Sequence, residues 1–247
     1  MEILSQFLLR LAFGLAVGMA ITPSRQVSSG FFRNHLYVTL GLSTLAVLVL
    51  SKLDTHAMWF AGAASVFSFF GAACWLYEAR LAGKTSLWLI AFCDFAAAVL
   101  SQYSHYAGTA FQHEIAIGAS GLVLGLVFAA MLLGHWYLNT PGMSLKPLRT
   151  LLAVASIAIV LQAIISASGF VSAWSTQTEI SSTWLLFLAL RWSFGIFGVL
   201  ALLWLAWQTL KVPNTQSATG ILYVAVIGVF VGELMSALLS AESAFPL

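Results

Sequence analysis

Long apolar stretches and short polar segments alternate along the chain, and eight of the apolar stretches are close to the length of a membrane span. A helix needs about 20 mostly apolar residues to cross a bilayer. The second and fourth stretches are short, so we expect these two helices to extend into their polar flanks. The predicted spans are Ile3–Ile21, Leu36–Leu50, Trp59–Tyr77, Leu87–Ser101, Ile115–Tyr137, Leu151–Val171, Trp184–Trp207 and Ile221–Leu239.

The apolar runs are continuous, which favours helices over a membrane β-barrel, whose strands alternate apolar and polar residues. In lipid, a helix also satisfies the backbone polar groups of each span internally. Composition agrees, because 61% of residues are hydrophobic and only 7% are charged, against about 25% charged in soluble domains. The sequence therefore predicts an all-α, polytopic integral membrane bundle of eight helices, with residues 1–247 forming one domain.

Basic residues are distributed unevenly between the loops. Seven Lys and Arg residues fall in the loops after spans one, three, five and seven, whereas Lys52 is alone on the opposite face. The positive-inside rule then predicts that both termini lie outside, on the periplasmic or extracellular side of a prokaryotic inner (plasma) membrane. The seven residues are Arg25, Arg33, Arg80, Lys84, Lys146, Arg149 and Lys211.

Proline marks three turns on the predicted inner face, at Thr22-Pro23, Thr140-Pro141 and Val212-Pro213. Each turn follows a helix that contains glycine, which suggests a repeated unit of helix, proline turn and helix. Proline also ends helices in general, and glycine is common in membranes. The pattern therefore leaves a true internal repeat and ordinary helix termination both open.

Small residues recur at helical spacing in spans one and five. The Gly14–Gly18 and Gly121–Gly125 steps allow close approach between helices, either inside the bundle or at a contact with another subunit. Cys74 and Cys93 both lie inside apolar spans. They are better explained as small core residues than as a disulfide.

Ionisable side chains inside the spans are the sharpest functional signal. Each costs roughly 2.5–3.5 kcal/mol at the bilayer centre on insertion scales. The depth of each group follows from the rise of about 1.5 Å per residue. Asp94 falls near the middle of the membrane, and the uncharged Gln162 lies close to the middle. The other ionisable side chains lie in the outer half. We expect these groups to converge on one cavity that opens outward. The candidates for ligand binding or proton handling are Arg10, Asp94, Glu114, Gln162, Arg191 and Glu233.

A purely structural role for these charges stays open at this stage. Arg10 with Glu233, or Arg191 with Asp94, can form interhelical ion pairs that fix the bundle. Arg10 can also extend to the outer head groups.

The five histidines lie near helix ends and allow two haem arrangements. His113 and His135 are about 33 Å apart along one helix, so they cannot share one iron. His35 with His135 would ligate haem b on the inner side, and His113 with His56 or His105 on the outer side. Plain polar residues at helix ends are the alternative. No pair has the i, i+4 spacing of a metal site, so no metal centre is predicted.

No sequence motif indicates a stand-alone enzyme. The chain lacks a glycine-rich phosphate loop, a His-Glu-x-x-His motif and a Gly-x-Ser-x-Gly motif. A non-catalytic subunit of an oxidoreductase is compatible with this, since a bound cofactor can carry the chemistry. The leading hypothesis is a membrane subunit or anchor of a quinone-linked electron-transfer complex, with other membrane or periplasmic subunits as partners. A small-solute transporter or channel and a structural or assembly subunit are the alternatives, and nothing indicates nucleic acid binding.

Overall fold

A computed structural model describes residues 1–53, 56–102, 110–140, 142–176 and 181–242, and this part of the chain is helical with no strand. Continuous apolar sequence forms long helices because each helix pairs its own backbone groups. The helices are α1 (Glu2–Ile21), α2 (Ser29–Leu50), α3 (Ala57–Leu76), α4 (Arg80–Gln102), α5 (Ala110–Asn139), α6 (Lys146–Thr176), α7 (Ser182–Leu190), the π-helix η1 (Arg191–Gly198), α8 (Val199–Thr209) and α9 (Thr215–Glu242).

The prediction of eight helices long and apolar enough to span a membrane is confirmed within these residues. The two short stretches extend into their polar flanks as expected, since α2 covers Ser29–Leu50 and α4 covers Arg80–Gln102. The seventh stretch differs from a plain α-helix, because it consists of α7, η1 and α8 in direct succession.

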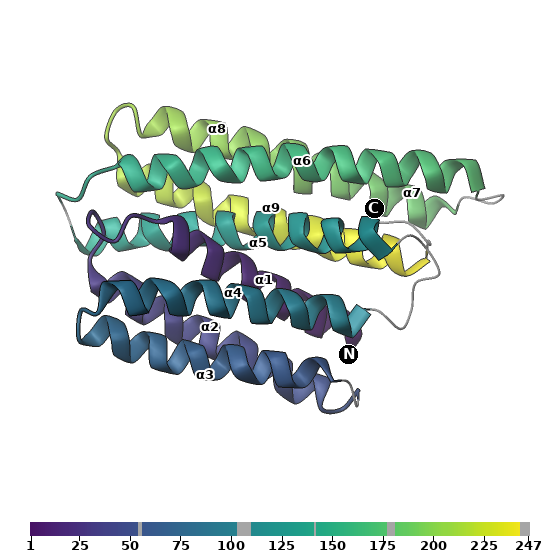
Figure 1. Ribbon diagram of the computed structural model, residues 1–247. Coiled ribbons are helices and arrows are strands. Elements are labelled where there is room, and N and C mark those ends of the chain that lie inside the picture. Colours follow the sequence, from purple (N-terminus) through teal and green to yellow (C-terminus); the bar gives the residue numbers. More distant parts are fainter. Residues whose placement is uncertain (54–55, 103–109, 141, 177–180, 243–247) are drawn as a thin grey trace.

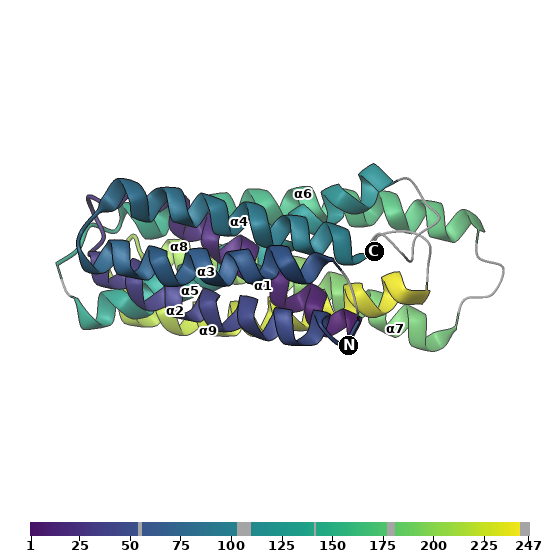
Figure 2. The ribbon, with the colours of Figure 1, turned by 60° about the horizontal axis from the view of Figure 1, so that its bottom comes forward.

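All helices run along one long axis, as the two views show (Figure 1, Figure 2). We call the end at which α1 begins and α9 finishes the terminal end. The opposite end, where α1 leads to α2, α3 to α4, α5 to α6 and α8 to α9, is called the basic end (Figure 1). The seven basic residues counted from the sequence lie in these turns or in the adjoining helix ends.

The helices pack as two groups of four spans. In the first group α1 contacts α2 and α4, and α3 contacts both α2 and α4. In the second group α5 contacts α6 and α9, while the α7–η1–α8 span contacts α9 and, less extensively, α6. Contact between α1 and α5 joins the two groups along the middle of the bundle (Figure 1).

Glycine makes the contact between α1 and α5 possible. A Cβ atom added at Gly14 would overlap the backbone of Gly121, and one added at Gly125 would overlap the backbone of Gly14. One turn further along, Gly18 faces the Cβ of Ala129. The two small-residue steps found in the sequence therefore pack against each other inside the chain, as small-xxx-small contacts do.

The π-helix η1 also approaches its neighbour through glycine. Gly195 of η1 and Gly232 of α9 face each other so closely that a Cβ on either would lie within about 2.6 Å of the other's Cα. A π-helical turn is wider than an α-helical turn and is frequent at functional sites. Here it begins at Arg191 and places that residue opposite α9.

Candidate functional site

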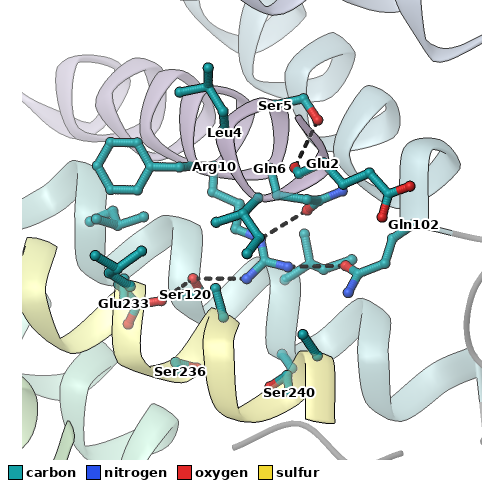
Figure 3. Close-up of a pocket in the computed structure, with 18 of the residues that line it drawn as sticks. Glu2, Leu4, Ser5, Gln6, Arg10, Gln102, Ser120, Glu233, Ser236 and Ser240 are labelled. Atoms are coloured by element: carbon teal, nitrogen blue, oxygen red, sulfur yellow. Dashed lines mark hydrogen bonds between the residues drawn. The ribbon is translucent and has the colours of Figure 1, made fainter. Parts of the chain in front are cut away.

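A cavity of about 940 Å³ lies at the terminal end, between the two groups of helices. The first part of α1 and the last part of α9 line it, together with α5, α6, the end of α4 and Arg191 of η1. Its lining is largely apolar, with a small number of polar side chains that converge on the interior (Figure 3). This combination is typical of sites that bind small organic molecules.

The most buried charged groups of the cavity are Arg191 and Glu233, which form an ion pair. Arg191 Nη1 lies 2.7 Å from Glu233 Oε1, and the two side chains are only 2% and 4% exposed. Gln162 Nε2 of α6 donates to the same carboxylate oxygen at 2.6 Å. Ser120 Oγ of α5 donates to the other oxygen, Oε2. Glu233 thus accepts hydrogen bonds from three different spans.

Arg10 extends the polar network from the second group of helices to the first. Its guanidinium donates to Ser120 Oγ at 3.3 Å, to Gln102 Oε1 at 3.0 Å and to Gln6 Oε1 at 3.1 Å (Figure 3). Gln6 in turn donates to Ser101 Oγ at 2.7 Å on α4. Ser120 is therefore the shared partner that connects Arg10 of α1 with Glu233 of α9.

Two buried donors of the cavity lining have no hydrogen-bond partner among the residues that the structure describes. They are Arg191 Nε and Ser166 Oγ. Buried donors are nearly always paired, and exceptions are explained by a bound molecule, an ion or a functional strain. Both donors are suited to an oxygen acceptor on a bound ligand.

The structure brings together four of the six candidates from the sequence. Arg10, Gln162, Arg191 and Glu233 line the cavity, whereas Asp94 and Glu114 do not. Glu114 is half-buried near the start of α5. Asp94 is fully buried in the first group of helices, where it accepts from Ser43 Oγ at 3.2 Å.

The ion pairs suggested from the sequence form differently. Arg191 pairs with Glu233 rather than with Asp94, because α9 packs on η1 while α4 belongs to the other group of helices. Arg10 and Glu233 are connected through Ser120, which accepts from Arg10 and donates to Glu233. The carboxylate forms its ion pair with Arg191 instead.

Of the histidines, His35 and His135 lie close enough to each other to interact electrostatically. His113 is buried and lines the cavity, whereas His56 is exposed just before α3. His35 is buried near the basic end with its Nδ1 2.6 Å from Phe31 O, and His135 is exposed with its Nδ1 3.2 Å from Tyr223 Oη. His105 lies outside the described residues. The described part of the chain contains no cluster of three or more His, Cys, Asp or Glu residues that could hold a metal ion.

Sequence reasoning did not identify the network members Gln6, Gln102 and Ser120, nor Ser166, which also lines the cavity. Gln6 carried a usable signal, since it precedes Arg10 by one helical turn and shares its face. The serines carried none, because serine is frequent in these helices and usually bonds to its own backbone. Comparisons with protein-family models, with curated proteins and with solved structures find no match to this chain.

Proposed function

We propose that the chain is an integral membrane subunit of a quinone-linked electron-transfer complex and that the cavity binds the quinone head group. Membrane insertion is supported by eight apolar helices and by large apolar side chains exposed around the bundle, such as Phe92, Phe197 and Trp204. The excess of Lys and Arg at the basic end supports a cytoplasmic position for that end, and with it a position of the cavity in the outer half of a prokaryotic plasma membrane.

The buried Arg191–Glu233 pair at the cavity wall is the observation that carries this proposal. A quinone has a flat ring with oxygen atoms on opposite sides and an apolar tail. Arg191 Nε and Ser166 Oγ are buried donors without a partner among the described residues, and both residues line the cavity. The apolar remainder of the lining suits the ring and tail, and the cavity volume falls within the range of small-molecule sites.

In the direction of quinol oxidation, both phenolic O–H bonds break and two electrons leave the ring. We assign one proton to the Glu233 carboxylate, which is held in place by Gln162 and Ser120, and the other to water at the cavity mouth. The electrons pass to a haem or iron–sulfur protein, the class of partner subunit that this proposal requires at the terminal end. Arg191 keeps Glu233 oriented and stabilises its charged form through the ion pair.

Ligand binding is tested by the thermal stability of the purified chain in detergent with ubiquinone and menaquinone analogues. We expect a rise in Tm that depends on analogue concentration, because a ligand of the native state stabilises it. Glu233→Gln weakens a charge-assisted hydrogen-bond site, so the apparent Kd should rise at least about tenfold. Glu114→Gln is the matched control, since Glu114 is at the same end but does not line the cavity. Equal stabilisation of both variants, or none of the native chain, contradicts the proposal.

A small-solute transporter is the second candidate, and the π-helical segment of the seventh span favours it. Spanning helices that depart from α-helical geometry commonly contribute to transporter binding sites, and η1 begins at the cavity residue Arg191. Purification in mild detergent from native membranes, with mass spectrometry of co-eluting proteins, separates the two. Stoichiometric redox subunits support the electron-transfer role. Elution alone, with thermal protection by a soluble solute and not by quinone analogues, supports transport, and protection by neither supports a structural or assembly role.

A further inference from the structure

A second buried carboxyl group lies outside the cavity. The Asp94 side chain is fully buried in the first group of helices, and Ser43 Oγ is hydrogen-bonded to both of its oxygens at 3.2 Å. The uncharged thiol of Cys93 is its neighbour along α4. Unlike Glu233, Asp94 has no cation within ion-pairing distance among the described residues. A carboxylate buried without a cation is strongly disfavoured, so the site is built for the protonated form.

Asp94 and Glu233 occupy corresponding places in the two groups of helices. Each carboxyl belongs to the fourth span of its group, α4 or α9. Each accepts a hydrogen bond from a polar side chain of the second span, Ser43 of α2 or Gln162 of α6. The two groups also share the same order of neighbours around their centres. The position of Asp94 is therefore the counterpart of a position that lines the cavity in the other group.

Buried hydroxyl groups lead from Asp94 toward the basic end. Ser43 lies one helical turn from Thr39 on α2, and Thr39 Oγ1 donates to Ser68 Oγ of α3 at 3.3 Å. Gly71 of α3, three residues further toward the basic end, faces Ser86 Oγ of α4. All four hydroxyl-bearing side chains are buried, and three of them are fully buried. These residues alternate between α2, α3 and α4 along the centre of the first group.

The basic end of this series carries an unsatisfied donor. Trp75 Nε1 is buried and has no hydrogen-bond partner among the described residues. It lies beside Gly83, and the carbonyl of Gly83 accepts from Ser86 Oγ at 2.8 Å. Buried polar groups of this kind are usually satisfied by internal water. A water molecule between Trp75 and Ser86 would connect the hydroxyl series to the turn between α3 and α4.

We propose that Asp94 is a proton-binding site that exchanges with water at the basic end along the hydroxyl series Ser86, Ser68, Thr39 and Ser43, with Trp75 Nε1 donating to an internal water at the start of the series. The proton moves between water and a carboxyl oxygen of Asp94, so that only O–H bonds form and break and no electron is transferred. Internal water bridges the helical turns between hydroxyl groups. This site is separate from the cavity, and its existence does not depend on whether the cavity binds quinone.

Infrared spectroscopy of the full chain in lipid nanodiscs, without added quinone, tests the proposal. At neutral pH we expect the C=O band of a protonated carboxylic acid, which shifts when H₂O is replaced by D₂O. Asp94→Asn should remove this band. If that variant does not fold, Asp94→Glu keeps a carboxyl group and should move the band instead. Absence of a protonated band in the native chain, or a band unaffected by substitution of Asp94, overturns the proposal.

The route is tested by the rate at which the same band shifts in D₂O. The double variant Thr39→Val with Ser68→Ala removes the hydroxyl link between α2 and α3, and we expect exchange to slow at least about tenfold, or about 1.4 kcal/mol in the barrier. The control is Thr44→Val with Ser65→Ala, because Thr44 Oγ1 donates to Ser65 Oγ at 3.3 Å on the exposed face of the same two helices. Equal exchange rates in the two double variants refute the route.

Discussion

Replacement of Arg191 and Glu233, singly and together, gives the most direct measure of the energetics of the cavity. Their side chains are 2% and 4% exposed, and the charged atoms are 2.7 Å apart. Removing one partner of such a buried pair leaves the other charge uncompensated and costs about 3–5 kcal/mol. Arg191→Met therefore leaves the Glu233 carboxylate without an opposite charge, although Gln162 and Ser120 still donate hydrogen bonds to it. Glu233→Gln leaves the Arg191 guanidinium without an opposite charge.

The double variant Arg191→Met with Glu233→Gln removes both charges and retains similar side-chain volumes. Because a neutral replacement of a buried ion pair is often close to neutral in stability, we expect it to lose much less than the sum of the single losses. The resulting coupling energy should be at least about 3 kcal/mol. SDS titration in mixed micelles, followed by the fluorescence of the nine tryptophans, measures the free energy of unfolding of each variant.

Additive losses, within about 0.5 kcal/mol, would refute the reasoning, because they would show that the two residues do not share one buried interaction. Glu114→Gln serves as the control. Glu114 is half-buried and does not line the cavity. Its substitution should change the free energy of unfolding by no more than about 0.5 kcal/mol.

Three further predictions concern packing, capping and the cysteines. Gly125→Ala places a Cβ on the backbone of α1 and should destabilise the chain by at least about 2 kcal/mol. Gly41 has open space around it, so Gly41→Ala should not destabilise the chain. Equal unfolding free energies of the two variants would disprove the close contact. Lys84 Nζ donates to three carbonyls at the end of α1, those of Met19, Ala20 and Thr22. Lys84→Met should therefore lower the free energy of unfolding by about 3 kcal/mol. A loss below about 1 kcal/mol in the same SDS titration would argue against this helix cap. Cys74 and Cys93 are free, so maleimide labelling after denaturation without reductant should modify both thiols, and a single or absent modification would show that they are oxidised.

The length and continuity of the apolar stretches predicted the number of membrane-length helices and their positions along the chain. This works because in a helix each span satisfies its own backbone, so length and polarity are local properties of the sequence. The extension of α2 and α4 into polar residues followed from the same length requirement. The π-helix that begins at Arg191 was not predicted, because the sequence from Ser182 to Thr209 has the composition of one apolar helix. The π-helix packs closely against Gly232 of a different span, a contact that the sequence of the seventh span does not reveal.

For the site, the charges pointed to one end of the bundle, since their depth follows from residue counts along each helix. Which charges meet was decided only by helix packing. Arg191 lies against Glu233 because glycines bring η1 onto α9, and Asp94 is separated from both because α4 packs in the other group of helices. The uncharged partners Ser120 and Gln102 join the network through contacts between residues far apart in sequence. Helix formation is local and can be deduced from sequence, whereas the choice of neighbour depends on the fit of complete helix surfaces.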